Sequence, residues 1–125
     1  MAGIAEKIQL PASRAPEVPD IPVGRKSRDL QFMARLFDGF ANTTRLSLLL
    51  LLARRGEMCV GELVEEVGAP QPRVSDHLRC LDRCGFVRVR REGRKAYYSV
   101  ADDRVYELLS LGASVLEDNR QTIAD

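Results

Sequence analysis

Two cysteines four residues apart, Cys80 and Cys84, are the residues of this sequence best suited to chemistry. At that spacing in a helix the side chains lie on one face, so the two sulfur atoms would be neighbours. Paired thiolates bind soft ions such as Zn²⁺ and Cu⁺, and by extension Cd²⁺, Pb²⁺, Hg²⁺ and arsenic as As(III). The pair therefore predicts a site for a thiophilic metal or metalloid ion, with two small packed thiols as the alternative.

Residues beside the pair affect how readily it would bind an ion. Arg79 and Arg83 are expected to lower the pKa values of the thiols and so to favour the thiolates that bind metal. His77 stands three residues before Cys80, so a site of one nitrogen and two sulfur ligands is geometrically conceivable. It is the only histidine. The sequence also has no phosphate-binding glycine loop and no Cys/His pair with a third orienting group, which argues against an enzyme.

The cysteine pair ends one of several predicted helices. Apolar spacing, capping residues and glycines predict helices over residues 28–40, 42–55, 60–67 and 71–84, and a last helix from 102 or 103 to 123. Alternating apolar and basic residues predict two strands and the turn between them, over residues 86–91, 96–100 and 92–95. The second helix is apolar nearly all round, so we expect it to be the buried central helix.

The two short helices before the strands have the arrangement of a helix-turn-helix, with Val67-Gly68-Ala69-Pro70 as the turn. The basic hairpin that follows would be its wing. The predicted fold class is therefore mainly α with a small β-hairpin wing (α+β). It is a winged helix-turn-helix with the element order α-α-α-α-β-β-α.

The second helix of this motif and the hairpin carry side chains suited to DNA. The helix offers donors for base edges and phosphates at Gln71, Arg73, Ser75, His77 and Arg79. The hairpin offers cations for phosphates or the minor groove at Arg88, Arg90, Arg91, Arg94 and Lys95. The whole chain has a net charge of only +1, but residues 71–95 hold eight Arg or Lys and three acids, a local net of +5. We therefore expect double-stranded DNA as a partner, and the alternative is a winged helix that contacts only proteins.

The 125 residues are expected to form one domain with a tail. Residues 1–24 hold four of the six prolines and predict a flexible N-terminal arm, which leaves 25–125 as the winged-helix domain. The longest apolar stretch, 46–53, is far shorter than the roughly 20 residues of a membrane span, and no signal peptide is recognisable. An odd number of cysteines, three, favours a reducing cytoplasm.

Four segments in order resemble the ArsR/SmtB family of repressors. They are Asn42-Thr43-Thr44-Arg45-Leu46, Gly56-Glu57-Met58-Cys59-Val60-Gly61-Glu62-Leu63, Val74-Ser75-Asp76-His77-Leu78 and Arg91-Glu92-Gly93-Arg94-Lys95-Ala96-Tyr97-Tyr98. The resemblance covers about residues 28–120 and lies in the ordered combination of motifs. It implies a homodimeric winged-helix repressor that binds a palindromic operator and is released by an inducer. It also implies that the first and last helices form the dimer interface.

The helix predicted over residues 71–84 would be the helix that reads DNA. Its end, Cys-Leu-x-x-Cys-Gly over residues 80–85, resembles the CmtR-like cadmium- and lead-sensing branch of the family. In that branch a third cysteine comes from a C-terminal tail, and no cysteine follows Cys84 here. Cys59 matches the first cysteine of the family's Glu-Leu-Cys-Val-Cys-Asp-Leu box, with Gly61 at the second. It is a candidate ligand or a thiol packed at a helix start. The resemblance makes His77 a DNA contact or a structural residue.

The predicted function is a transcriptional repressor that leaves its operator when Cd, Pb, Hg or trivalent As binds cysteine thiolates. Allosteric coupling of that kind changes DNA affinity about 5–150-fold. A thiol-redox or persulfide switch at Cys80 and Cys84 is the alternative. It would require the helix to distort, because the Cβ vectors of residues four apart are nearly parallel instead of convergent.

Overall fold

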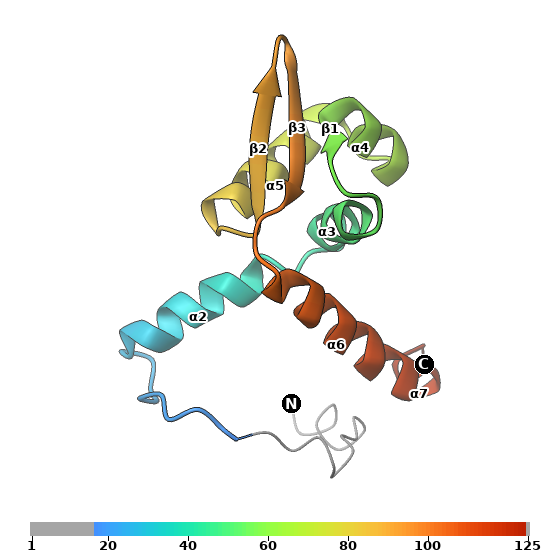
Figure 1. Ribbon diagram of the computed structural model, residues 1–125. Helices are drawn as coiled ribbons and strands as arrows, with labels where there is room; N and C mark the ends of the chain where they lie inside the picture. The colour runs from blue at the N-terminus through green and yellow to red at the C-terminus, as the bar shows by residue number, and fades with distance from the viewer. Residues whose placement is uncertain (1–16, 125) are drawn as a thin grey trace. The chain divides into compact units, whose positions relative to one another are not determined.

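The computed structural model describes residues 17–124, with side chains described as far as residue 122. In order the elements are α2 (Arg28–Asp38), α3 (Thr43–Arg55), β1 (Met58–Cys59), α4 (Val60–Val67), α5 (Gln71–Arg83), β2 (Val87–Glu92), β3 (Lys95–Val100), α6 (Arg104–Asp118) and α7 (Arg120–Ala124) (Figure 1). The predicted winged helix-turn-helix is confirmed, with a short strand added before α4. Residues 1–16 of the predicted arm lie outside the described range, and 17–24 belong to no helix or strand.

The chain divides into two compact units, one of residues 21–106 and one that contains 107–125. The first unit holds α2 through β3 and is built around α3. That helix begins after Asn42, whose side chain accepts a hydrogen bond from the Arg45 N–H at 3.1 Å, and ends at Gly56 with a positive φ of 79°. Leu48, Leu49 and Leu52 of α3 are completely buried, so α3 is the central helix, as predicted.

The helix-turn-helix consists of α4 and α5. Gly68 ends α4 in the left-handed region with φ 75°, a conformation that costs glycine little because it has no Cβ. Val74, Leu78 and Leu81 of α5 are completely buried, and their helical spacing places them on one face. Burial of this stripe fixes the rotation of α5 about its axis. The polar residues between these positions are consequently turned outward.

The hairpin belongs to a three-stranded antiparallel sheet with the order β1-β3-β2. Strand β1 pairs with β3 through Met58 opposite Tyr98 and Cys59 opposite Tyr97. Sequence patterning missed β1 because two residues are too few to show a period of two. Strands β2 and β3 pair over their full length, from Val87 opposite Val100 to Glu92 opposite Lys95.

The last predicted helix is interrupted. Helix α6 ends at Asp118, and α7 restarts at Arg120. Between them Asn119 is buried, and its Nδ2 donates a hydrogen bond to the Val115 carbonyl at 3.0 Å. Within residues 17–124 no single helix is both long and apolar enough to cross a membrane, and α2 and α3 meet that measure only as a pair bent by 74°.

Gly39, at the end of α2, is expected to tolerate no larger residue. A Cβ there would lie 2.8 Å from Cε2 of Phe86 and 3.2 Å from the Leu36 carbonyl oxygen. Phe86 has little room to move, because it is buried and packs on Phe40 with ring centroids 4.7 Å apart. We expect Gly39→Ala to lower the free energy of unfolding by about 1–3 kcal/mol.

Urea unfolding at fixed protein concentration would measure this effect, with Gly61→Ala as the matched control. Gly61 lies in α4 and has nothing within 4 Å of its added methyl group, so the same change should stabilise the protein by up to about 1 kcal/mol. Equal effects of the two substitutions would show that Phe86 gives way easily.

Candidate nucleic-acid interface and cysteine pair

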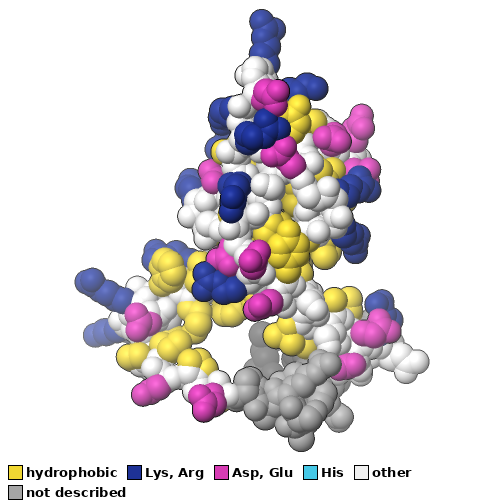
Figure 2. Space-filling model, in the orientation of Figure 1, with side chains coloured by type: hydrophobic (Ala, Val, Ile, Leu, Met, Phe, Trp, Pro, Cys, Tyr) yellow, Lys and Arg dark blue, Asp and Glu magenta, His cyan; other side chains and the backbone are white. Residues whose placement is uncertain are grey.

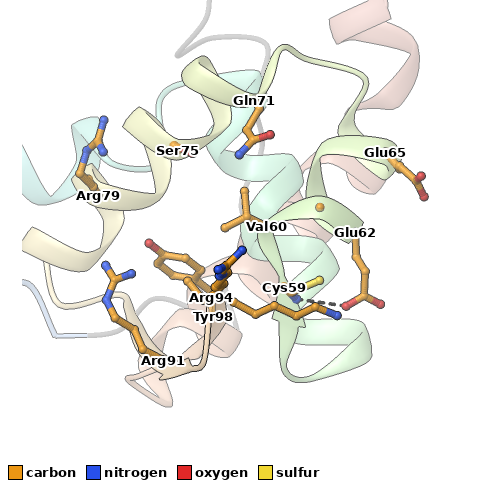
Figure 3. Close-up of a pocket in the computed structure, with 13 residues that line it drawn as sticks. Cys59, Val60, Glu62, Glu65, Gln71, Ser75, Arg79, Arg91, Arg94 and Tyr98 are labelled. Atoms are coloured by element: carbon orange, nitrogen blue, oxygen red, sulfur yellow. Dashed lines mark hydrogen bonds between the residues drawn. The ribbon is translucent and has the colours of Figure 1, made fainter.

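A groove of about 650 Å³ lies between α4, α5 and the β2–β3 hairpin (Figure 3). Four cations line it, and these are Arg79, Arg91, Arg94 and Lys95. Two neutral hydrogen-bonding side chains, Gln71 and Ser75, and two carboxylates, Glu62 and Glu65, line it as well, together with Tyr98 and Cys59. The groove is therefore a mainly cationic surface with neutral donors, a combination suited to a polyanion with readable edges.

Helix α5, the second helix of the helix-turn-helix and the predicted DNA-reading helix, contributes one of its faces to this groove. Gln71, Ser75 and Arg79 are four residues apart in succession, so they form a single line along the helix. Arg79 also pairs with Asp76 one turn earlier. Arg73 and His77, which the sequence also nominated for DNA contact, do not line the groove. The structure therefore separates the five predicted positions of this helix into two faces.

The wing contributes Arg91, Arg94 and Lys95 to the groove, in agreement with the predicted set. Figure 2 shows Lys and Arg side chains at the tip and along the sides of the hairpin, with Asp and Glu between them. Strand alternation turns neighbouring residues to opposite faces, so Arg90 points away from the groove that Arg91 lines. Arg88 is likewise absent from the groove lining, and it donates to the Ala101 carbonyl at 3.0 Å.

Arg90, predicted as a DNA contact, is already occupied. Its guanidinium bonds both carboxylate oxygens of Glu57, at 2.7 and 3.1 Å, and Glu92 at 2.6 Å. The hydrogen bonds to Glu57 and Glu92 raise the pKa of Arg90, and the hydrogen bonds from Arg90 are the main cause that lowers the pKa of Glu57. Arg90 is therefore less available to an anion than the wing cations that face the groove.

The cysteine pair sits on a different side of α5. Cys80 and Cys84 are both half-buried, both thiols are free, and neither lines the groove. The Cys84 thiol interacts directly with Cys80. Burial first, and then the charge and hydrogen bond of Cys80, raise the pKa of Cys84, while Arg45 and Arg83 oppose this effect more weakly. The expectation that nearby arginines would lower the thiol pKa is therefore wrong for Cys84, because desolvation outweighs them.

A buried arginine connects this side of α5 to the end of α2. Arg45, whose side chain is 13% exposed, donates to the carbonyl oxygens of Asp38 at 2.7 Å and Gly39 at 3.1 Å. Its Nη1 lies 3.1 Å from Nδ1 of His77. Because a guanidinium can only donate, Nδ1 is the acceptor and the imidazole is neutral. Burial, Arg45 and Arg73 all lower the pKa of His77.

This contact supports a structural role for His77, one of the two that the family resemblance implies. The sequence assigns Arg45 no individual role, and Arg45 appears there only as part of a family motif. Its signal in the sequence is weak, because a single arginine in the first turn of an apolar helix does not reveal what it will meet.

Cys59 stands apart from the pair. It is the residue before α4, lines the groove, and its backbone N–H donates to Oε1 of Glu62 at 3.1 Å. That hydrogen bond is the main reason why the pKa of Glu62 is lowered. In the part of the chain that the structure describes, no three His, Cys, Asp or Glu side chains form a group that could hold a metal ion. One chain thus presents two neighbouring thiols and does not bring Cys59 or His77 to them as a third ligand.

Ion binding at the pair is expected to strengthen as pH rises. Because the Cys84 pKa lies above its ordinary value, the thiol is protonated at neutral pH, and an incoming ion must displace that proton. We expect the Cd²⁺ association constant to rise by about tenfold per pH unit for each proton displaced, between about pH 6 and pH 8.

Competition titrations followed by the ultraviolet thiolate band would measure this slope. Cys84→Ser is the control, since removing one thiol proton should lower the slope by about one decade per pH unit. A pH-independent constant for the unaltered protein would contradict a protonated Cys84 thiol.

The chain is similar in sequence and in structure to known proteins. Residues 42–89 match the sequence model described as bacterial regulatory protein, arsR family. A probable mercury resistance operon repressor of Streptomyces lividans is 49% identical over 86 residues, which cover 69% of this chain and 68% of that protein. The AntR antimony-specific transcriptional repressor is 32% identical with a TM-score of 0.70, covering 90% of this chain and 97% of its own. The homodimeric winged helix-turn-helix DNA-binding domain Mb0332 from Mycobacterium bovis is 33% identical with a TM-score of 0.66, covering 80% and 92%.

Proposed function

The chain belongs to the ArsR/SmtB family of bacterial transcriptional regulators, and from this premise we propose that it is a repressor that binds operator DNA as a homodimer. The proteins that it matches are transcriptional regulators and not enzymes, and the chain is a regulator of the same kind. A thiophilic metal or metalloid ion that binds Cys80 and Cys84 releases the DNA. The observation that carries the DNA-binding half is the groove in which Gln71, Ser75 and Arg79 of the reading helix face the cations of the wing.

The DNA-binding role divides between the two walls of the groove. The line of polar residues on α5 supplies donors and acceptors for base edges, and Arg79 has the bidentate geometry that suits guanine. Arg91, Arg94 and Lys95 supply charge for phosphates. Glu62 and Glu65 repel phosphates, so they restrict the DNA backbone to the wing side of the groove. The expected complex therefore places α5 in the major groove and the wing on the adjacent backbone.

Dimerisation is supported by apolar side chains that the single chain leaves exposed. On α2, Phe32 is 58% and Phe37 is 55% exposed, and on α6, Leu111 is 54% exposed. Large apolar residues gathered on helices at this level of exposure are typical of a surface that a partner covers. A palindromic operator requires a two-fold dimer, and Mb0332 is a homodimeric relative.

The switching half of the proposal rests on the position of the thiol pair. Cys80 and Cys84 end the same helix that reads DNA, yet they lie away from the groove, so an ion can bind without touching DNA. Their neighbour Arg45 ties α5 to the end of α2. An ion that rearranges this side of α5 would shift the reading helix relative to α2, one of the two predicted dimer helices.

The inducer is a soft ion, and the third ligand comes from outside the pair. Two sulfur ligands select thiophilic ions, and two similar proteins are a probable mercury resistance repressor and an antimony-specific repressor. We therefore place Hg²⁺, Cd²⁺, Pb²⁺ and the trivalent metalloids arsenic and antimony first among the candidates.

Fluorescence anisotropy with a promoter fragment from the protein's own locus tests both halves. The reduced protein should bind at low salt, and one of these ions should release the DNA together with an ultraviolet thiolate charge-transfer band. Binding that no ion disturbs but peroxide or polysulfide reverses would replace the metal switch with an oxidative one. No binding at low salt would refute the DNA-binding role and leave a winged helix that contacts proteins.

A further inference from the structure

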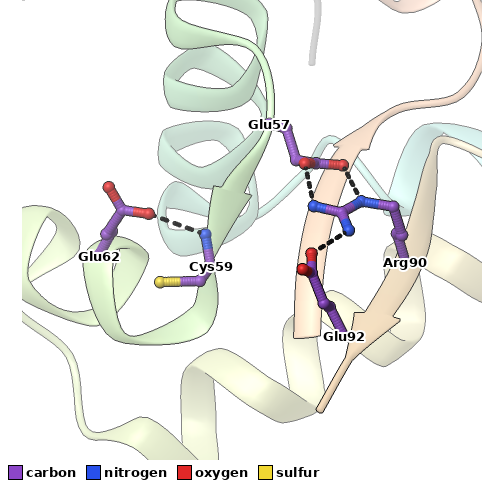
Figure 4. Close-up of polar contacts among 5 residues, drawn as sticks. All are labelled: Glu57, Cys59, Glu62, Arg90 and Glu92. Atoms are coloured by element: carbon purple, nitrogen blue, oxygen red, sulfur yellow. Dashed lines mark hydrogen bonds and ion pairs between the residues drawn. The ribbon is translucent and has the colours of Figure 1, made fainter. Parts of the chain in front are cut away.

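Arg90 holds an unusual position among the cations of the wing, because it points away from the groove and is held by two carboxylates (Figure 4). Glu57 binds it through two hydrogen bonds, at 2.7 and 3.1 Å, and Glu92 binds it at 2.6 Å. Its guanidinium carbon also lies 4.6 Å from the centroid of the Tyr97 ring. Three contacts therefore fix a side chain that a simple phosphate-binding role would leave mobile.

The bidentate pair crosses the sheet from one edge to the other. Glu57 immediately precedes β1, Arg90 belongs to β2, and the strand order is β1-β3-β2. The middle strand passes beneath the pair at Tyr97, which lies opposite Arg90 on one side and Cys59 on the other. The Glu57–Arg90 pair thus connects the outer strand of the wing directly to the segment that joins α3 and α4.

The position of this pair along the hairpin determines what it can control. Strand β1 supports β3 only at Tyr97 and Tyr98, so residues 91–96 of the hairpin extend beyond the three-stranded part of the sheet. A two-stranded ribbon of this kind twists and bends easily. Arg90 lies at the last position that β1 reaches, immediately before the free part. The direction in which Arg91, Arg94 and Lys95 leave the sheet is therefore decided at Arg90.

We infer that the Glu57–Arg90 pair is a clasp that positions the wing for DNA, and that Glu57 acts through Arg90 without touching DNA. The inference rests on the DNA-binding half of the proposed function and is independent of the metal switch. It is not a device for stability, because Arg90 is 50% and Glu57 39% exposed and such pairs stabilise folded proteins little. Its contribution is to hold three phosphate contacts in one place before DNA arrives.

Removal of the Glu57 charge distinguishes positioning from simple electrostatics, because the two predict opposite signs. Loss of a carboxylate near a polyanion strengthens binding if only net charge matters. If the clasp positions the wing, Glu57→Gln weakens DNA binding by about two- to fivefold, the range that an exposed ion pair can supply, and the salt dependence falls by up to about one phosphate contact. Glu66→Gln is the matched control, since it removes the same charge from a carboxylate that also pairs with an arginine, Arg55, but does not line the groove, so it should leave affinity unchanged or raise it.

Two further measurements complete the test. Arg90→Lys keeps the charge but loses the bidentate geometry, so it should weaken binding in the same way as Glu57→Gln. Amide hydrogen exchange in the DNA-free protein should become faster in residues 91–96 of both variants, with little change in thermal midpoint. Unchanged exchange together with unchanged or tighter DNA binding would overturn the clasp. Failure of the unaltered protein to bind DNA would refute the proposed function, whereas the exchange measurement would still decide whether the clasp holds the wing.

Discussion

Replacement of both Cys80 and Cys84 by serine is expected to abolish the release of DNA by thiophilic ions. In the unaltered protein a saturating ion should weaken DNA binding by about 5–150-fold, the usual range of allosteric coupling. In the double variant the change should be less than about twofold, because serine oxygens are poor ligands for soft ions. DNA affinity without the ion should stay close to normal, because neither residue lines the groove.

The measurement is an anisotropy titration of the DNA complex with Hg²⁺, Cd²⁺, Pb²⁺ and the trivalent arsenicals and antimonials, in the presence of a reductant that does not bind metal. Cys59→Ser is the matched control, since it makes the same chemical change at the one other cysteine. It should keep full release. If Cys59→Ser alone abolished release, Cys59 would have to reach the pair through the dimer, and the ligand set would be three thiolates.

The second large effect is expected from the wing. Neutralising its groove-facing cations with Arg91→Gln, Arg94→Gln and Lys95→Gln should weaken operator binding by about 10²–10³-fold at physiological salt. The slope of log affinity against log salt should also fall by about 2.7, since each phosphate contact contributes about 0.9. Base preference should change little, because phosphate contacts carry no sequence information.

Arg91→Gln and Arg88→Gln form a matched pair for this prediction. Both remove one positive charge from β2, but Arg91 lines the groove, whereas Arg88 does not and donates to the Ala101 carbonyl. Arg91→Gln should therefore lower affinity and the salt slope, while Arg88→Gln should leave the slope nearly unchanged. Equal losses from the two substitutions would mean that DNA senses only the total charge of the hairpin.

Much of the fold could be read from local signals. Helix α4 has the predicted bounds, and α3 and α5 differ from prediction by no more than a residue at either end. Capping residues, glycine stops and apolar spacing act within one or two turns, so they are visible in any short window. The break at Asn119 escaped detection because one asparagine is too weak a signal to end a helical pattern, and the feature that marks it is burial, which depends on packing.

The candidate site was predictable in composition but not in arrangement. The +5 charge of residues 71–95 and the polar side chains of the second helix of the helix-turn-helix predict a DNA-facing surface from the sequence alone. Arg90 and Arg91 are neighbours of the same type, and the sequence nominated both. Only the pairing of β2 with β3 and the carboxylate of Glu57 separate them, one to the groove and one to the clasp.

The sequence by itself determined the class of protein, the order of its elements apart from β1 and the break between α6 and α7, and which helix carries both the predicted reading surface and the thiol pair. These properties depend on residue type and on spacing within a helix or strand. The tertiary structure alone decided the partner of Arg90, 33 residues away at Glu57, and the partner of His77, 32 residues away at Arg45. It also reversed the expected shift in the Cys84 pKa. Burial and contacts between distant segments set these properties, because desolvation and long-range pairing exist only once the chain has folded.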